Sequence, residues 1–130
     1  MIDASALVEI LLRTGRADQL MERAFQGSEK MHAPQLLDVE ITQVLRRLVR
    51  QKEITTARAE EALQDLADLV IERHGHQALV QRIWQLRDSL SAYDGAYVAL
   101  AEALAAPLLT CDGKLAAVHG HRARIELVPL

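Results

Sequence analysis

The sequence predicts one α/β domain in which helices cover both faces of a short, mostly parallel sheet. Short apolar segments bounded by turn residues alternate with longer segments of helical periodicity, and this alternation is typical of parallel sheets. The chain has 130 residues, of which 50% are hydrophobic and only 3% aromatic, so we expect an aliphatic core. We find no linker, repeat or low-complexity segment and expect one domain over residues 1–130.

The first half of the chain predicts a clipped strand followed by three helices and a second strand. Met1–Ile2 resembles the end of a strand that runs into a helix over Ala4–Arg13, which Asp3 or Ser5 caps and Gly15 ends. The next elements are a helix closed by Gly27, a short strand and a long helix that Pro34 opens: Arg16–Gln26, Lys30–Ala33 and Gln35–Gln51.

The second half repeats this alternation. A Thr-capped helix, a strand and another helix are expected over Thr55–Leu66, Leu69–Glu72 and Gln77–Leu90. In the last of these, Val80, Trp84 and their apolar neighbours have the spacing of core residues, so Trp84 is expected in the core. A Ser91-capped helix, a break at Pro107, a buried strand, a short helical segment and a final strand follow: the last three cover Leu108–Thr110, Gly113–His119 and Arg124–Val128.

Composition narrows the class of protein. A net charge of −3 is no signature of a nucleic-acid binder, although basic residues gather around Arg46, Arg47 and Arg50. The single cysteine, Cys111, excludes an internal disulfide and fits a reducing compartment. The N-terminal residues have neither the apolar run of a signal peptide nor that of a membrane span, so a cytoplasmic protein is expected.

Four acids stand where strands end or helices begin. Taken singly, each has a structural explanation: Asp3 as a helix cap, Asp94 in a capping box with Ser91, Asp112 in a turn, and Glu40 in the first turns of a helix. Asp94 nevertheless lies on the face that its helix must bury, where an unpaired carboxylate is costly.

Together, these acids predict a metal site. Strand ends and helix starts share one edge of a parallel α/β sheet, which is where ligands bind, so the four carboxylates can converge there. Carboxylates in one pocket repel each other unless a cation is present, and oxygen ligands suit Mg²⁺ or Mn²⁺. Two such ions can activate a water in phosphodiester cleavage. No His or Cys has a spacing that suggests zinc.

The segments around these acids resemble the ordered acidic motifs of PIN-domain ribonucleases, and most closely the VapC-type toxins of bacterial toxin–antitoxin pairs. The four segments are Ile-Asp-Ala-Ser at 2–5, Leu-Leu-Asp-Val-Glu-Ile at 36–41, Ser-Ala-Tyr-Asp-Gly-Ala-Tyr at 91–97 and Leu-Thr-Cys-Asp-Gly-Lys-Leu at 109–115. The resemblance covers essentially the whole chain. Only two residues precede Asp3, where PIN domains usually have several apolar ones.

The resemblance implies a three-layer α/β/α sandwich and a Mg²⁺- or Mn²⁺-dependent endoribonuclease, the toxin of a type II pair, that cleaves RNA by metal-activated water. It implies that Asp3, Glu40, Asp94 and Asp112 bind the metal and are catalytic, with Ser5 and Thr110 as supporting hydroxyls. The expected partners are an RNA substrate and a cognate small antitoxin that covers the acidic cleft. A homodimer is also expected, although the sequence does not fix the oligomeric state, and no membrane is involved.

Other interpretations stay open at the level of sequence. Helical geometry does not choose between Glu40 and Asp38, and only the family pattern favours Glu40. Tyr97 is expected to pack rather than react, and the three arginines to form a solvated face. The alternative function is a catalytically weak PIN-like domain that acts as a binding protein. Receiver-type phosphoacceptor and haloacid-dehalogenase-type domains are disfavoured, because Asp3 has no acidic neighbour and Ser5 stands where the latter needs a second acid.

Overall fold

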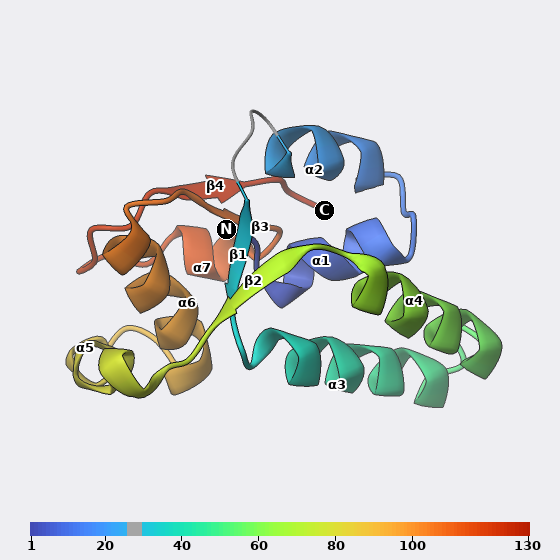
Figure 1. Ribbon diagram of the computed structural model, residues 1–130, viewed down its shortest axis with the longest axis horizontal. Coiled ribbons are helices and arrows are strands. Elements are labelled where there is room, and N and C mark those ends of the chain that lie inside the picture. Colours follow the sequence, from blue (N-terminus) through green and yellow to red (C-terminus); the bar gives the residue numbers. More distant parts are fainter. Residues whose placement is uncertain (26–29) are drawn as a thin grey trace.

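The computed structural model describes residues 1–25 and 30–130 and has the predicted three-layer α/β/α architecture. Figure 1 shows α5, α6 and α7 on one side of the strands and α1, α3 and α4 on the other. The elements of the first half are α1 (Ala4–Leu11), α2 (Ala17–Ala24), β1 (Met31–Pro34), α3 (Leu37–Arg50) and α4 (Thr56–Asp68). Those of the second half are β2 (Ile71–His74), the 3₁₀ turn η1 (Gln77–Leu79), α5 (Val80–Gln85), α6 (Ala92–Leu104), β3 (Leu108–Thr110), α7 (Gly113–Ala116) and β4 (Ile125–Leu127).

All strand pairs are parallel, and the short N-terminal segment joins them into one layer. β1 pairs with β2, and β3 pairs with β4. Between these two pairs lies Ile2, which bridges Leu109 of β3 and donates its N–H to the carbonyl of His32 in β1, at 3.4 Å. Met1–Asp3 therefore takes the central position in the sheet, although it is too short to form a strand of its own. Ile2 is fully buried there.

The core lies where α1 and α6 pack on the strands, and it is aliphatic as predicted. Its largest buried side chains include Leu7, Leu37, Ile41, Leu108 and the ring of Tyr97. Helices α5 and α6 approach closely at Gly95, where an added Cβ would lie 3.3 Å from the Ile83 side chain. None of the described helices is long and apolar enough to span a bilayer.

Three helices begin at the capping residues that the sequence predicts. Asp3 caps α1, Thr55 caps α4 and Ser91 caps α6, each through a side-chain oxygen that accepts a backbone N–H of the first turn. Gly15 does not end α1: the helix stops at Leu11, and Arg13 takes the left-handed conformation with φ 54°.

Two predicted elements were misplaced, the long helix after Pro34 and the strand at Leu69–Glu72. Pro34 closes β1 instead of opening a helix, because the N–H of Gln35 still bonds to the carbonyl of His74 and continues the strand pairing. Helix α3 therefore begins at Leu37. The predicted strand over Leu69–Glu72 lies two residues later, as β2. The predicted end of the second helix at Gln26 and Gly27 lies outside the described residues.

The segment Gln77–Leu90 was the largest error. It forms η1 and the short α5, and then turns in which Arg87 N–H bonds to the carbonyl of Trp84 and Ser89 N–H to that of Leu86. Only Leu86 of the expected stripe is buried, while the Trp84 side chain is 65% exposed. Trp84 is therefore not a core residue. Its ring instead stacks under the guanidinium of Arg87, 4.5 Å from the ring centroid.

Candidate active site

Asp3 lies at the centre of the site, at the end of the central segment of the sheet. One carboxylate oxygen accepts the Ser5 hydroxyl at 2.7 Å and the N–H of Ala6 at 3.0 Å, and the other accepts the Thr110 hydroxyl. Asp3 is only 6% exposed, so burial raises its pKa, the hydrogen bonds from Ser5, Thr110 and Ala6 oppose this, and Asp112 adds to the rise. The predicted cap and the predicted site residue are thus the same side chain.

The two supporting hydroxyls connect Asp3 to the end of β3. Ser5 Oγ lies 3.2 Å from Thr110 Oγ1 and accepts the N–H of Cys111 at 3.0 Å. Thr110 Oγ1 also accepts the N–H of Asp112, at 3.0 Å. The hydroxyls therefore orient Asp3 and fix the backbone that leads to Asp112. Burial raises the pKa of the Cys111 thiol to about 11, so this thiol stays protonated at neutral pH.

Asp112 and Asp94 reach the same region from two helix starts. Asp112 caps α7 and accepts the N–H of Lys114 at 2.8 Å through Oδ1. Asp94 lies in the first turn of α6, and its N–H donates to Ser91 Oγ at 3.2 Å. Within the described chain, the Asp94 carboxylate accepts no hydrogen bond in return, so only half of the expected capping box forms. Burial raises the pKa of Asp94, and the charges of Asp112 and Asp3 raise it further.

Glu40 approaches from α3. Its Oε1 atom is buried and has no hydrogen-bond partner among the described residues, and the same holds for the Tyr97 hydroxyl. Tyr97 and Glu40 nevertheless lie close enough for each to shift the pKa of the other. Burial raises the pKa of Glu40, Tyr97 lowers it, and the charges of Asp94 and Asp3 raise it again. Burial and then Glu40 raise the pKa of Tyr97, so this phenol stays neutral while its ring packs in the core.

The structure thus brings all four predicted acids to one end of the sheet. Each of Asp3, Glu40 and Asp94 has a raised pKa caused first by burial and then in part by the other acids. Asp38, two residues from Glu40, takes a different place. It forms a bidentate ion pair with Arg73 of β2, with N–O distances of 2.6 and 2.8 Å.

Comparison with known proteins decides the family. The family model described as "PIN domain" matches residues 1–120 of the chain. The chain belongs to the PIN-domain family. Its relatives include Ribonuclease VapC12 of Mycobacterium tuberculosis, which is 42% identical over 127 residues, covering 98% of this chain and 97% of the relative. Ribonuclease VapC9 of the same species is 41% identical over 128 residues, again covering 98% and 97% of the two chains.

The acids of this PIN domain fit a divalent cation. All four donors are carboxylates, Glu40 Oε1 is buried with no hydrogen-bond partner among residues 1–25 and 30–130, and the raised pKa values of Asp3, Glu40 and Asp94 agree with a metal-free site that lacks positive charge. Hard oxygen ligands of this kind suit Mg²⁺ or Mn²⁺ better than softer ions. Asp3, Glu40, Asp94 and Asp112 could therefore hold the ion, as the resemblance predicts.

Sequence reasoning missed a second cluster in this PIN domain. It consists of His32, Glu72 and His74, whose ligand atoms all lie within 4.8 Å of one another. In the part of the chain that the structure describes, no other group of three or more His, Cys, Asp or Glu residues comes this close. Their spacing along the chain gives no motif, because His32 and His74 are 42 residues apart. The sequence could have indicated this cluster only through the pairing of two short strands that each carry a histidine. That inference requires the correct strand register.

Proposed function

We propose that this chain is a Mg²⁺- or Mn²⁺-dependent endoribonuclease and the toxin of a type II toxin–antitoxin pair. The observation that carries the proposal is the convergence of four carboxylates at the ligand-binding end of the sheet, where burial and the neighbouring acids raise the pKa values of Asp3, Glu40 and Asp94. Relatives that match the chain over nearly their whole length are named ribonucleases. These two lines of support are independent.

The four acids take different roles in the proposed mechanism. Asp3 is the best-fixed ligand, because two hydroxyls and one backbone N–H hold its carboxylate. Asp94 keeps both of its oxygen atoms available, and Asp112 keeps the one that Lys114 does not use. Glu40 has a buried oxygen that accepts no hydrogen bond from the part of the chain that the structure describes. When bound, the divalent ion supplies an activated water for hydrolysis and stabilises the charge that develops on the phosphodiester.

Cleavage of RNA by the purified protein tests the enzymatic part. We expect fragments from total RNA with millimolar Mg²⁺ or Mn²⁺ and none with excess chelator. Asp3→Asn, Asp94→Asn and Asp112→Asn should each abolish most of the cleavage. An intact, folded protein that leaves RNA unaltered with both ions would instead favour a catalytically weak binding domain.

The proposed antitoxin would have an apolar surface to bind beside the acids. A groove of about 480 Å³ begins at Ser5 and continues between α1 and α3. Its charged lining residues are Glu9, Arg47 and Glu53, and its apolar ones are Val8, Leu12, Val44, Leu48, Ile54 and Leu130. A short amphipathic segment in this groove would end next to Asp3, because Ser5 donates to that carboxylate. Occupation of the groove could therefore block the site.

Expression in bacteria tests the toxin assignment. Production of the chain alone should stop growth, and co-production of the small protein encoded beside it should restore growth. Asp94→Asn serves as the matched control and should be harmless at the same protein level. Harmless overproduction of the intact chain with active nuclease in vitro would reject the toxin role while leaving the enzyme assignment in place.

A further inference from the structure

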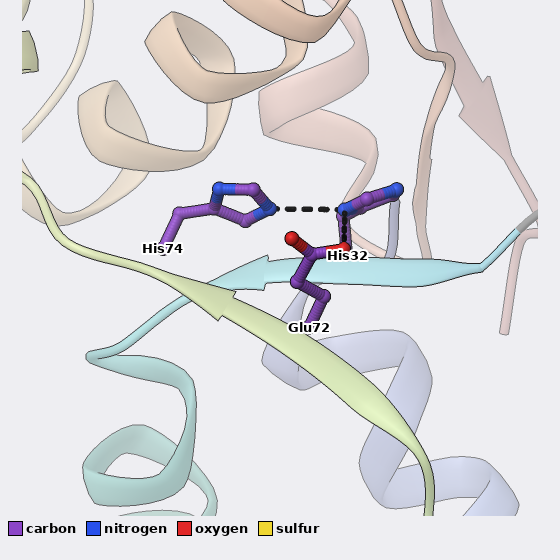
Figure 2. Close-up of side chains that lie close together, drawn as sticks. All are labelled: His32, Glu72 and His74. Carbon is purple, nitrogen blue, oxygen red and sulfur yellow. Dashed lines mark hydrogen bonds and ion pairs between the residues drawn. The ribbon is translucent and has the colours of Figure 1, made fainter.

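Three side chains from β1 and β2, which have no role in the proposed nuclease, share one face of the sheet: His32, Glu72 and His74. His32 pairs in register with Glu72, so their side chains point to the same side, and His74 lies two residues further along β2 and returns to that side. Figure 2 shows both imidazole rings and the Glu72 carboxylate on the same side of the two strands. The side chains of His32 and Glu72 are 25% and 50% exposed, so ions can reach them from solvent.

The distances match those between the ligands of a small tetrahedral ion. His32 Nδ1 lies 2.9 Å from His74 Nε2 and 3.7 Å from Glu72 Oε2. Zinc binds imidazole nitrogen at ~2.0–2.1 Å and carboxylate oxygen at ~2.0–2.2 Å, so tetrahedral ligand atoms stand about 3.3–3.5 Å apart. The two rings need to separate by only a few tenths of an ångström, and the exposed Glu72 side chain can rotate inward.

We propose that His32, Glu72 and His74 form a metal site of their own for a divalent transition ion of the Zn²⁺ class, with water in the remaining position. Two imidazoles and one carboxylate favour such an ion over Mg²⁺, which prefers oxygen ligands and retains its waters. The four acids of the candidate active site offer oxygen alone. The two sites therefore select different metals.

The hydrogen-bonded ring pair is ready to exchange a proton for a metal ion. In the metal-free protein one ring nitrogen of the pair donates to the other, so one of the two carries a hydrogen. An ion between them takes the place of that hydrogen, which moves to the outer nitrogen of the same ring, Nε2 of His32 or Nδ1 of His74, so both rings stay neutral. The exchange needs a change of tautomer and no movement of the strands.

The bound ion would cross-link β1 to β2. Within the described sheet, β2 pairs only with β1, and β1 in turn receives the N–H of Ile2 at the carbonyl of His32. Ligands from both strands would link β1 and β2 through their side chains. The strand β1 lies next to the segment that carries Asp3. We therefore expect the ion to stabilise the fold rather than to take part in RNA cleavage.

Titration calorimetry with Zn²⁺ in the presence of millimolar Mg²⁺ tests the site on the full chain, since Mg²⁺ competes with Zn²⁺ for the acids if the proposed function holds. We expect one Zn²⁺ per chain, with affinity lowered at least about tenfold by His32→Asn and by His74→Asn. His76→Asn is the matched control, because His76 is exposed and only two residues from His74, and it should bind like the wild type. Asp94→Asn should also keep its Zn²⁺, which separates this site from the proposed nuclease centre.

A second measurement avoids any problem of variant folding. In the wild-type protein, Zn²⁺ should shift the ring-nitrogen NMR signals of His32 and His74 and leave those of His76 and His119 in place. Unchanged ring signals, or Zn²⁺ affinity that survives both His32→Asn and His74→Asn, would overturn the proposal.

Discussion

At the scale of single residues, Asp94 combines a position in a helix cap with its proposed role at the metal site. Its backbone takes part in a helix cap, but its carboxylate accepts no hydrogen bond within the described chain and its pKa is raised by burial and by two other acids. A side chain placed only for stability would use its carboxylate to complete the cap. The repulsion between these acids therefore lowers the free energy of unfolding of the metal-free protein.

Asp94→Asn should therefore keep or raise the free energy of unfolding in chelator, because a neutral amide removes repulsion without removing a hydrogen bond. RNA cleavage should fall by about a hundredfold or more, the usual scale for loss of one electrostatic contact at a reacting centre. Melting curves and cleavage rates measure the two effects. Asp38→Asn is the control: loss of its partly exposed pair with Arg73 should cost at most about 1 kcal/mol and leave cleavage near wild type.

A destabilised Asp94→Asn that still cleaves RNA at the wild-type rate would show that Asp94 serves as a helix cap. Asp112→Asn should behave like Asp94→Asn, because asparagine can still cap α7 by accepting the N–H of Lys114.

The raised pKa values predict an unusual pH dependence for the metal-free protein. Asp3, Glu40 and Asp94 hold their protons to higher pH in the folded chain than in the unfolded chain, where ordinary values are 3.8 for Asp and 4.5 for Glu. Above those values the folded state binds more protons, so these acids lower stability as pH rises through the folded pKa values. Unfolding measured in chelator from acid to neutral pH should show a smaller decline for Asp94→Asn than for the wild type. Parallel curves for the two proteins would contradict the crowded-acid interpretation.

At the scale of elements, α6 presents Asp94 at its start and is fixed near its other end by Glu102. The Glu102 side chain is 4% exposed and accepts two N–H groups of Arg82 in α5, at 2.7 and 2.9 Å, and the N–H of Arg122 at 2.7 Å. The guanidinium of Arg82, followed by other contacts, lowers the pKa of Glu102. This contact connects the exposed α5 to a buried helix.

Arg82→Ala should lower the free energy of unfolding by about 1–3 kcal/mol, because it leaves the Glu102 carboxylate with fewer donors. The lost stability should be largest at neutral pH and shrink as pH falls through the lowered pKa of Glu102, since the pair stabilises the fold only while Glu102 is ionised. Denaturant unfolding at several pH values measures this. Arg87→Ala removes the ring contact with Trp84 and an exposed hydrogen bond to the Trp84 carbonyl, and should cost less than about 1 kcal/mol. Equal losses for the two variants would reject a special role for the Arg82–Glu102 pair.

At the scale of the whole molecule, metal binding at the four acids should stabilise the fold. A ligand at a hundredfold excess over its Kd adds ~2.7 kcal/mol to the free energy of unfolding. Millimolar Mg²⁺ or Mn²⁺ should raise the melting temperature, and more at neutral than at acid pH, because protonated acids bind cations poorly. Thermal melts with each ion measure the shift, and Asp94→Asn should reduce it. An unchanged melting temperature with both ions at every pH would count against a metal site.

The sequence by itself determined the features that depend on local interactions. Caps at Thr55 and Ser91, the helical stripes of α3 and α6, and the places of the acids at strand ends follow from contacts within one or two turns of chain. The resemblance built on those acids led to the PIN-domain family, which the comparison confirmed. The roles of the individual acids remain predictions.

Only the tertiary structure decided the features that depend on strand register and on packing between distant segments. Helical periodicity could not choose between Asp38 and Glu40, because both lie at edges of the same stripe; the position of Arg73 on β2 pairs Asp38 and leaves Glu40 beside Asp3 and Asp94. The same register brings His32 to His74. Trp84 has core spacing but no helix long enough to bury it. For Asp38 and His32 the deciding partner lies tens of residues away, where local pattern carries no information.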